Sequence, residues 1–518
     1  MFRKIAFVTF ALLILALPTL AQEDSPQRGN VVRGVCVSAI TSLDPQQSEL
    51  GICDLSAYNA LYNKLIRLDE TGNVVPEIAT EWTVSDDGRT YTFTIRDDVI
   101  FHDGNPLDAE AVKFSLDRIR DPESASPVSG NLSVIDTINV VDGTTVEVVL
   151  SEPSAAFLSV LAAAPGASEI VSPAAVEEFG EDYRFNGVGS GPFQLVSWSP
   201  GETAVFERNP NYWEMGADDE ALPYLDGVEL SSIEDDTVRL LNLRSGTFDV
   251  NERIALTDVA AVEADDSLQV IETNTATAYA IAMNVSQPPF DDIRVRQAVQ
   301  LALDDDGIIN NLGLGRGYTS AFAFPRGTWY FYESQNPEPN LEMAQQLLAE
   351  AGYEDGLDVD FTHISRAVDA QLAQILQAQL SQIGISADIQ PLERTAWLDI
   401  WLVGAGENTE GQLGIFQNTV GIGDPDEKAI FFQPGGIVNF ADWDNADAWA
   451  AVEASRATLD QDERAEQWAT AIDLQIEDVP YVWLGNVPVI GAADANIQDI
   501  GLSASRSAWI FTETFVAE

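Results

Sequence analysis

Two different hydrophobic patterns divide the chain near residue 290. In the first half, apolar and polar residues alternate with a period of two on both sides of short turns, which predicts β-hairpins. Three turn dipeptides mark these hairpins: Asp87-Gly88, Asp142-Gly143 and Pro200-Gly201. Residues 31–40 predict a first strand. Helical spacing of apolar residues is found over 55–68, 109–119 (after a capping Asp108) and 172–180.

In the second half, amphipathic helices alternate with short apolar strands. Helices are predicted over 291–304, 341–352, 370–384, 446–460 and 463–477, and strands over 357–364 and 385–392. The order helix, strand, helix, strand is typical of an α/β unit with a mainly parallel sheet. No linker rich in Pro, Gly or Ser separates the two halves, so short strands are expected to join them.

The length of the chain favours more than one lobe. At 518 residues and 56.2 kDa the chain exceeds the size at which one hydrophobic core keeps growing. Its 46% hydrophobic and 21% charged residues are typical of a folded globular protein.

The first 21 residues have the pattern of a secretory signal peptide. Arg3 and Lys4 precede an apolar run over 5–17, and a small-x-small end predicts cleavage after Ala21. An uncleaved membrane anchor is the alternative, although the run is short for a span. No Cys lies near the segment, so we expect an exported protein, periplasmic or extracytoplasmic, without a lipid anchor.

The cysteines, the histidines and the net charge limit the kinds of site that the chain can form. Cys36 and Cys53 predict one disulfide in an oxidising compartment. No metal site or cofactor is expected, because the two histidines, His102 and His363, stand far apart. A net charge of −57 argues against nucleic-acid binding. It fits either a salt-tolerant acidic surface or the ordinary acidity of a secreted protein.

No catalytic constellation is found. The glycines at 187–192 precede a strand instead of a helix, which argues against a nucleotide loop. Carboxylates are so abundant that a glycosidase-like pair is only a weak signal. Aromatic and amide residues gather late in the chain, where residues 411–423 carry no charge, and this segment is predicted to face a ligand. About half of the tryptophans are expected to be core residues instead.

Taken together, the segments resemble a known family. Residues 61–119 strongly resemble the signature region of the family 5 extracellular solute-binding proteins, the dipeptide, oligopeptide, nickel and oligosaccharide receptors of ABC importers. Further matches in the family order are found over 189–213, 241–250, 288–304, 377–390 and 437–443. The resemblance implies an α/β, two-lobed periplasmic-binding-protein-like clamshell of class II, with mixed sheets and an extra subdomain on the first lobe.

The resemblance also implies the domain limits and the mode of action. After the signal peptide (1–21), lobe 1 is expected over 22–276 with a subdomain at about 60–190, lobe 2 over 277–484, and a return to lobe 1 over 485–518. The two crossings are expected near 275–285 and 479–489. Ligand contacts from both lobes would favour a closed form that the membrane permease recognises, with a monomeric receptor and no bond broken.

The expected ligand-binding residues follow from the family's way of lining its cleft. They are Thr41, Arg366, Trp397, Phe416, Gln417, Asn418, Thr419, Gly421, Asn439 and Trp443. In similar peptide receptors, an Asp three positions before the acidic residue of the "DP" turn pairs with the peptide ammonium. Alignment on Asp424-Pro425 puts Gly421 at that position, so the anchoring charge is missing. Arg366 is expected either to meet a ligand carboxylate or to be an ordinary surface arginine.

The predicted function is an exported receptor that captures a peptide or peptide-like ligand and delivers it to an ABC permease. Because the ammonium-binding Asp is replaced by Gly421, an oligosaccharide or polyol receptor of the same family is the alternative. A secreted carboxylate-based hydrolase is a more distant one, and a sensor that signals to a membrane partner also fits. A receptor releases its ligand unchanged, whereas a hydrolase releases products.

Overall fold

A ten-stranded mixed sheet runs through the computed structural model, which describes residues 26–48, 51–69, 71–124, 126–402, 411–420, 423–502 and 508–517. The strand order is β14-β13-β15-β12-β16-β11-β1-β10-β9-β8. In that order the strands are β14 (Ile385–Leu392), β13 (Leu357–Ile364), β15 (Leu413–Val420), β12 (Leu268–Met283), β16 (Tyr481–Asp494), β11 (Val250–Asn251), β1 (Val31–Cys36), β10 (Gly227–Ser232), β9 (Ala204–Arg208) and β8 (Phe193–Ser197).

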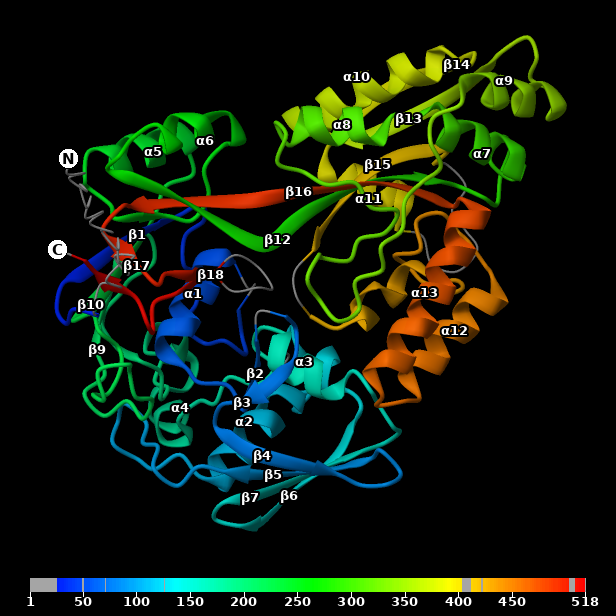
Figure 1. Cartoon of the computed structure of the whole chain (residues 1–518). Helices are drawn as coiled ribbons and strands as arrows, with labels where there is room; N and C mark the ends of the chain where they lie inside the picture. The colour runs from blue at the N-terminus through cyan, green and yellow to red at the C-terminus, as the bar shows by residue number, and fades with distance from the viewer. Residues whose placement is uncertain are drawn as a thin grey trace, which may run out of the picture.

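Two long strands, β12 and β16, connect the two halves of this sheet. They pair antiparallel from Leu268 opposite Asp494 to Ala282 opposite Tyr481, with irregularities in the register. Figure 1 shows them running from the elements around β1 to the elements around β13. Here, lobe 1 denotes β1 and β8–β11 with their helices, and lobe 2 denotes β13–β15 with theirs. The two segments in which crossings were predicted overlap β12 and β16.

A separate four-stranded antiparallel sheet forms a subdomain beside lobe 1, with strand order β4-β5-β7-β6. Its elements are β4 (Ala79–Val84), β5 (Thr90–Ile95), β6 (Ile135–Asp142), β7 (Thr145–Leu150), α2 (Ala109–Arg120), the 3-10 helix η1 (Ser129–Leu132) and α3 (Phe157–Ala163). The predicted hairpins at Asp87-Gly88 and Asp142-Gly143 are confirmed. The predicted cap is also present, because the Asp108 carboxylate accepts a hydrogen bond from the Ala111 N–H at 3.1 Å.

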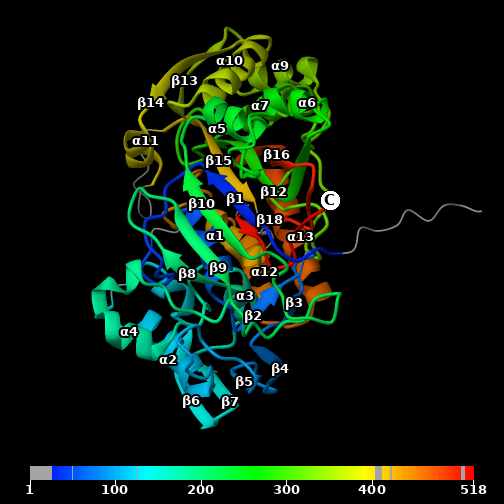
Figure 2. The ribbon, with the colours of Figure 1, turned by 90° about the vertical axis from the view of Figure 1, so that its left-hand side faces the viewer.

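Lobe 1 has its own apolar core. Its helical elements are α1 (Ile52–Leu61), α4 (Pro173–Phe179), η2 (Gly180–Phe185), α5 (Asp236–Arg244) and α6 (Leu256–Glu263). The core between α1 and the sheet contains Val32, Val250 and Trp509. Figure 2 shows β1, β9 and β10 of this lobe side by side, with α2 and β5–β7 at the opposite end of the molecule from α9 and α10. Four short strands of the C-terminal segment form two pairs: β17 (Ile497–Gln498) with β20 (Phe515–Val516), and β18 (Gly501–Leu502) with β19 (Trp509–Ile510).

The helix predicted over 55–68 is wrong in its second half. Helix α1 ends at Leu61, and Tyr62 has extended backbone angles. Residues 66–68 form strand β2 (Ile66–Leu68), which pairs with β3 (Val74–Pro76). Pairing with a distant segment thus overrides the local helical spacing of these apolar residues.

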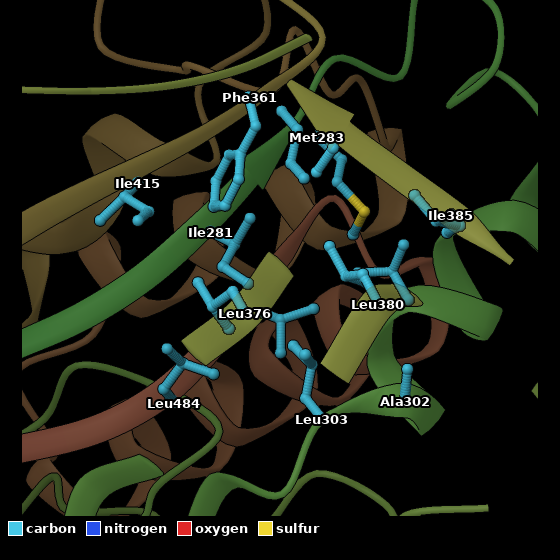
Figure 3. Close-up of a cluster of buried hydrophobic side chains, with 14 of the residues drawn as sticks. Ile281, Met283, Ala302, Leu303, Phe361, Leu376, Leu380, Ile385, Ile415 and Leu484 are labelled. Carbon is cyan, nitrogen blue, oxygen red and sulfur yellow. The ribbon is translucent and has the colours of Figure 1, made fainter. Parts of the chain in front are cut away.

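Lobe 2 buries apolar residues on both faces of its sheet. One face is covered by α7 (Ile293–Ala302), α8 (Asp305–Leu312), α9 (Leu341–Glu350) and α10 (Ala367–Ser381). The residues of this core come from strands and helices, as Figure 3 shows for Ile281, Phe361 and Leu376. The other face is covered by α11 (Arg394–Trp401), η3 (Pro425–Phe431), α12 (Ala446–Arg456) and α13 (Gln461–Asp478). This second core is dominated by aromatic rings.

The subdomain and lobe 2 also touch far from the connecting strands. The Ala155 N–H, just before α3, donates a hydrogen bond to the Arg456 carbonyl at the end of α12 (3.3 Å). Figure 1 shows α12 and α13 descending beside α3 and the β4–β7 sheet. The subdomain therefore contacts lobe 2 directly, away from β12 and β16. No helix in the described ranges is long and apolar enough to cross a membrane.

Candidate ligand-binding site

The end of β15 is linked to the start of α10 by a small polar network. The Gln417 side-chain amide donates to the Asp369 carboxylate, and its carbonyl accepts a hydrogen bond from Arg366 at 3.3 Å. Burial raises the pKa of Asp369, while Gln417 and Arg366 oppose that shift. The predicted residues Arg366 and Gln417 are therefore brought together, with Asp369 as a partner that the sequence did not indicate.

The next residues of β15 face different surroundings. The Asn418 side-chain carbonyl accepts a hydrogen bond from Lys428 of η3 at 2.8 Å. Thr419, opposite Thr277 of β12, is exposed. Gly421 lies outside the described residues. Within β15, Thr419 is thus the predicted site residue with the most accessible side chain.

The "DP" turn after β15 is held by ion pairs. Asp424 caps η3 through the Asp426 N–H at 2.9 Å and forms a buried, bidentate pair with Arg464 of α13 (2.6 and 2.9 Å). Asp426 pairs with Arg456 at 2.6 Å. Both acids therefore fix the turn against α12 and α13, which is a structural role.

Four of the predicted ligand-binding residues lie in the aromatic core of lobe 2. Trp397 is stacked on Trp401 with ring centroids 5.7 Å apart, and Phe416 lies among Phe431, Phe440, Tyr481 and Trp483. Asn439 bonds to the backbone of Trp443 and accepts from the Tyr481 hydroxyl at 3.0 Å. Trp443 donates to Asp478 at 3.0 Å. In this structure these four side chains are buried, and they pack beneath the candidate site instead of lining it.

Thr41 lies near the end of β1 and is tied to α1. Its N–H and its hydroxyl both donate to the buried Asp54 carboxylate, at 2.6 and 2.8 Å. The predicted disulfide between Cys36 and Cys53 is confirmed and fastens the end of β1 to α1, with the Cα atoms 5.6 Å apart. Thr41 is exposed, and its hydroxyl oxygen keeps the capacity to accept a hydrogen bond.

Arg366 lines a pocket at the carboxyl ends of the parallel strands β13 and β14. The pocket has a volume of about 360 Å³ and is lined by His363, Ser365, Arg366, Ala367, Ala370, Gln374, Ile389 and Pro391. Arg366 is exposed and forms no ion pair within 4 Å in the described part of the chain. The carboxyl ends of parallel strands are the usual place for ligands in α/β sheets.

Two other pockets each contain a basic residue that is already paired with an acid. A cavity of about 160 Å³ beside α1 and β2 contains Lys64, which lies 3.8 Å from Glu169. A broad groove of about 1140 Å³ beside α2 contains Arg118, which pairs with Asp44 at 2.5 Å. Among the described residues, no group of three His, Cys, Asp or Glu is placed to hold a metal ion.

Two neighbouring charged residues at the end of β11 were not predicted. Glu252 is buried and Arg253 is exposed. The Tyr279 hydroxyl in β12 has its pKa raised to about 12, mainly by burial, with Asp369 adding to the shift and the positive charges of Arg253 and Arg366 opposing it. Arg253 from lobe 1 and Arg366 from lobe 2 thus act on the same group. The sequence shows the Glu-Arg pair after a strand but gives no sign of its burial.

Comparison with known proteins identifies the family. The model of the bacterial extracellular solute-binding proteins, family 5 Middle, matches residues 73–436. The glutathione-binding protein GsiB of Salmonella paratyphi A is 30% identical over 504 residues, which is 95% of this chain and 94% of that protein.

Solved structures show the same fold. HbpA2 from Haemophilus parasuis superposes with a TM-score of 0.84 at 22% identity, covering 94% of this chain and 100% of that one. The periplasmic binding protein DppA from Helicobacter pylori, in complex with the peptide STSA, gives 0.75 at 24% identity, covering 95% and 99%. These neighbours bear out the predicted two-lobed α/β architecture. The chain therefore belongs to family 5 of the bacterial extracellular solute-binding proteins.

Proposed function

We propose that this protein binds a short peptide or peptide-like ligand with a free carboxylate between its two lobes and delivers it to an ABC permease. The observation that carries the proposal is Arg366, an exposed guanidinium at the end of β13 whose one described hydrogen bond is to a neutral amide. A guanidinium matches a carboxylate with two parallel hydrogen bonds. Within the described residues the Arg366 guanidinium forms no ion pair, so its charge is available to a ligand carboxylate.

The ligand class is supported by the relatives. GsiB is named as a glutathione-binding protein, and the DppA structure holds a peptide. The exposed end of β15 offers backbone groups to an extended ligand, as in strand addition. Thr41, Arg366, Gln417, Asn418, Thr419 and Gly421 remain our proposed contacts. Trp397, Phe416, Asn439 and Trp443 are proposed to act through packing behind the site.

The remaining features follow from the same proposal. Residues 1–21, which lie outside the described residues, serve as a cleaved signal peptide, and the mature receptor is an unanchored monomer. Lobe 1 comprises 22–276 and 485–518, with the subdomain at about 60–190, and lobe 2 comprises 277–484. The ligand leaves chemically unchanged, so the protein is not an enzyme.

Calorimetric titration with a panel of short peptides tests this function. We expect wild-type protein to bind peptides with a free carboxyl terminus and the Arg366→Gln variant to lose affinity by about 30-fold or more. Peptides amidated at the carboxyl terminus should bind both proteins equally weakly. Arg244→Gln, which changes an exposed arginine at the end of α5, is the matched control and should bind as wild type does.

Two results would contradict the proposal. Binding of neutral oligosaccharides without binding of any peptide would favour the polyol-receptor alternative, which rests on the uncharged segment 411–423. Conversion of a bound ligand into products would favour a hydrolase.

A further inference from the structure

Glu252 and Arg253 lie at the edge of the sheet where β1 and β11 end. The Glu252 N–H donates to the Val35 carbonyl of β1 at 3.1 Å, and the Ile254 N–H donates to the Ile490 carbonyl of β16 at 2.9 Å. Strands β11 and β1 are parallel neighbours in lobe 1. Glu252 and Arg253 therefore follow the carboxyl end of a parallel strand in lobe 1, as Arg366 follows the carboxyl end of a parallel strand in lobe 2.

The Glu252 carboxyl group lacks a hydrogen-bond partner. Glu252 is 1% exposed, and neither carboxyl oxygen accepts a hydrogen bond among the described residues. The other fully buried carboxylates, those of Asp44, Asp54, Glu77, Glu169, Asp369 and Asp424, each accept at least one. A buried polar group without a partner is costly, so such a group gains free energy when a ligand supplies a donor.

The surroundings of Glu252 leave it without a full counter-charge. Burial raises its pKa to about 7, and Arg253 is the strongest influence in the opposite direction, followed by the Val37 N–H and Arg239 of α5. The Val37 N–H favours the charged form but does not reach hydrogen-bond geometry. Near neutral pH the group is therefore divided between its neutral and charged forms.

The Arg253 guanidinium, like that of Arg366, has no carboxylate partner among the described residues. The Arg253 side chain is exposed, and in the ranges that the structure describes the guanidinium forms no hydrogen bond or ion pair, whereas the backbone N–H donates to Asn251 and the carbonyl accepts from Arg239. Most arginines of the described part have a carboxylate within 4 Å. Arg239, close by in the same lobe, is an example, because it pairs with Asp236. Arg253 follows β11, which pairs with β16, one of the two strands that continue into lobe 2.

We propose that Glu252 and Arg253 together bind an α-amino-acid head group of the ligand, meaning an ammonium and a carboxylate on one carbon, as at the γ-linked end of a γ-glutamyl peptide. Arg253 pairs with the carboxylate and Glu252 with the ammonium, after rotation about its side-chain bonds toward the edge. Arg366 holds the carboxylate at the other end of the ligand. The inference rests on the proposed function. It assigns Glu252 as the acid that pairs with the ligand ammonium, in place of the Asp that similar peptide receptors carry at the position of Gly421.

The number of protons released on ligand binding tests this inference directly. When the ammonium binds, the neutral Glu252 carboxyl group loses its proton to the buffer and the carboxylate pairs with the ammonium. At pH 6, where most of Glu252 is protonated, binding should release a proton, approaching one per ligand. Titration calorimetry in two buffers of different ionisation enthalpy measures that number.

Three probes separate the two charges of the head group: γ-glutamyl-cysteinyl-glycine, glutaryl-cysteinyl-glycine without the ammonium, and γ-aminobutyryl-cysteinyl-glycine without the α-carboxylate. Wild-type protein should prefer the first probe to each of the others by about 30-fold or more. Glu252→Gln should lose the preference over the glutaryl probe together with the proton release. Arg253→Gln should lose the preference over the γ-aminobutyryl probe.

Matched variants control for burial and charge. Asp305→Asn changes a half-buried acid whose pKa is also raised to about 7, and this variant should keep both preferences and the proton release. Arg244→Gln should keep them as well. Equal affinity of wild-type protein for all three probes, or unchanged preferences in both site variants, would overturn the inference while peptide binding itself persisted. Failure of every peptide to bind wild-type protein would overturn the proposed function and the inference with it.

Discussion

The unpaired Glu252 carboxyl group is expected to make the stability depend on pH. Its folded-state pKa of about 7 lies above the value of about 4.3 in an unfolded chain, so the folded protein binds the extra proton between these values. The free energy of unfolding therefore falls as the pH rises through this window. Replacement by Gln should leave stability unchanged at pH 4 and raise it by about 4 kcal/mol at pH 8 relative to wild type.

Urea unfolding of both proteins at several pH values measures this difference. A constant difference between Glu252→Gln and wild type from pH 4 to 8 would show that the group is not buried as described.

Individual residue roles were only partly predictable from the sequence. The Cys36–Cys53 disulfide and the Asp108 cap depend on residue type and local spacing, and both were predicted. The burial of Trp397 and Phe416 depends on which distant rings surround them, which spacing does not show. The lack of a hydrogen-bond partner for the Glu252 carboxyl group, which holds among the described residues, is also invisible in the sequence, because it depends on how distant segments pack around the group.

At the scale of elements, the turn after β15 depends on ion pairs with α12 and α13. The Asp424–Arg464 pair is buried, with side-chain exposures of 2% and 4%. Replacing Arg464 by Met would leave a buried carboxylate without its partner, which costs about 3–5 kcal/mol. Chemical denaturation should show that loss in the free energy of unfolding.

The neighbouring pair provides the control. Arg456 and Asp426 are more exposed, at 39% and 22%, so Arg456→Met should cost about 1 kcal/mol or less. Equal losses in the two variants would contradict a special role of the buried pair.

Elements with strong local signals were predicted closely. The strands over 357–364 and 385–392 have the expected bounds, and the turns at Asp87-Gly88 and Pro200-Gly201 join paired strands. The error over 55–68 arose because residues 66–68 pair with a strand that local spacing does not reveal. The network of Arg366, Asp369 and Gln417 joins two elements that are about 50 residues apart, so only the folded chain brings it together.

At the scale of the whole molecule, the charge of −57 should make the protein more stable in salt. Repulsion among the carboxylates opposes the compact state, and salt screens it over a distance of about 3 Å at 1 M. We expect the melting temperature to rise between low and molar NaCl. An unchanged or falling melting temperature would indicate ordinary acidity without a net electrostatic penalty.

The overall architecture was predicted through a resemblance in the order of segments, not through physical derivation. Strands β12 and β16 each span both lobes, and no local pattern marks where a strand passes from one lobe to the other. The contact between Ala155 and Arg456 joins parts 301 positions apart in sequence and could not be predicted from either segment.

The most direct test of ligand capture is mass spectrometry of the small molecules released when freshly purified protein is denatured, compared with a mock purification. We predict intact short peptides or γ-linked peptides with free carboxylates, released in amounts that fall in the Arg366→Gln variant. Neutral hexose oligomers as the only released solutes would contradict the carboxylate-binding site and assign the uncharged segment 411–423 to a different ligand class.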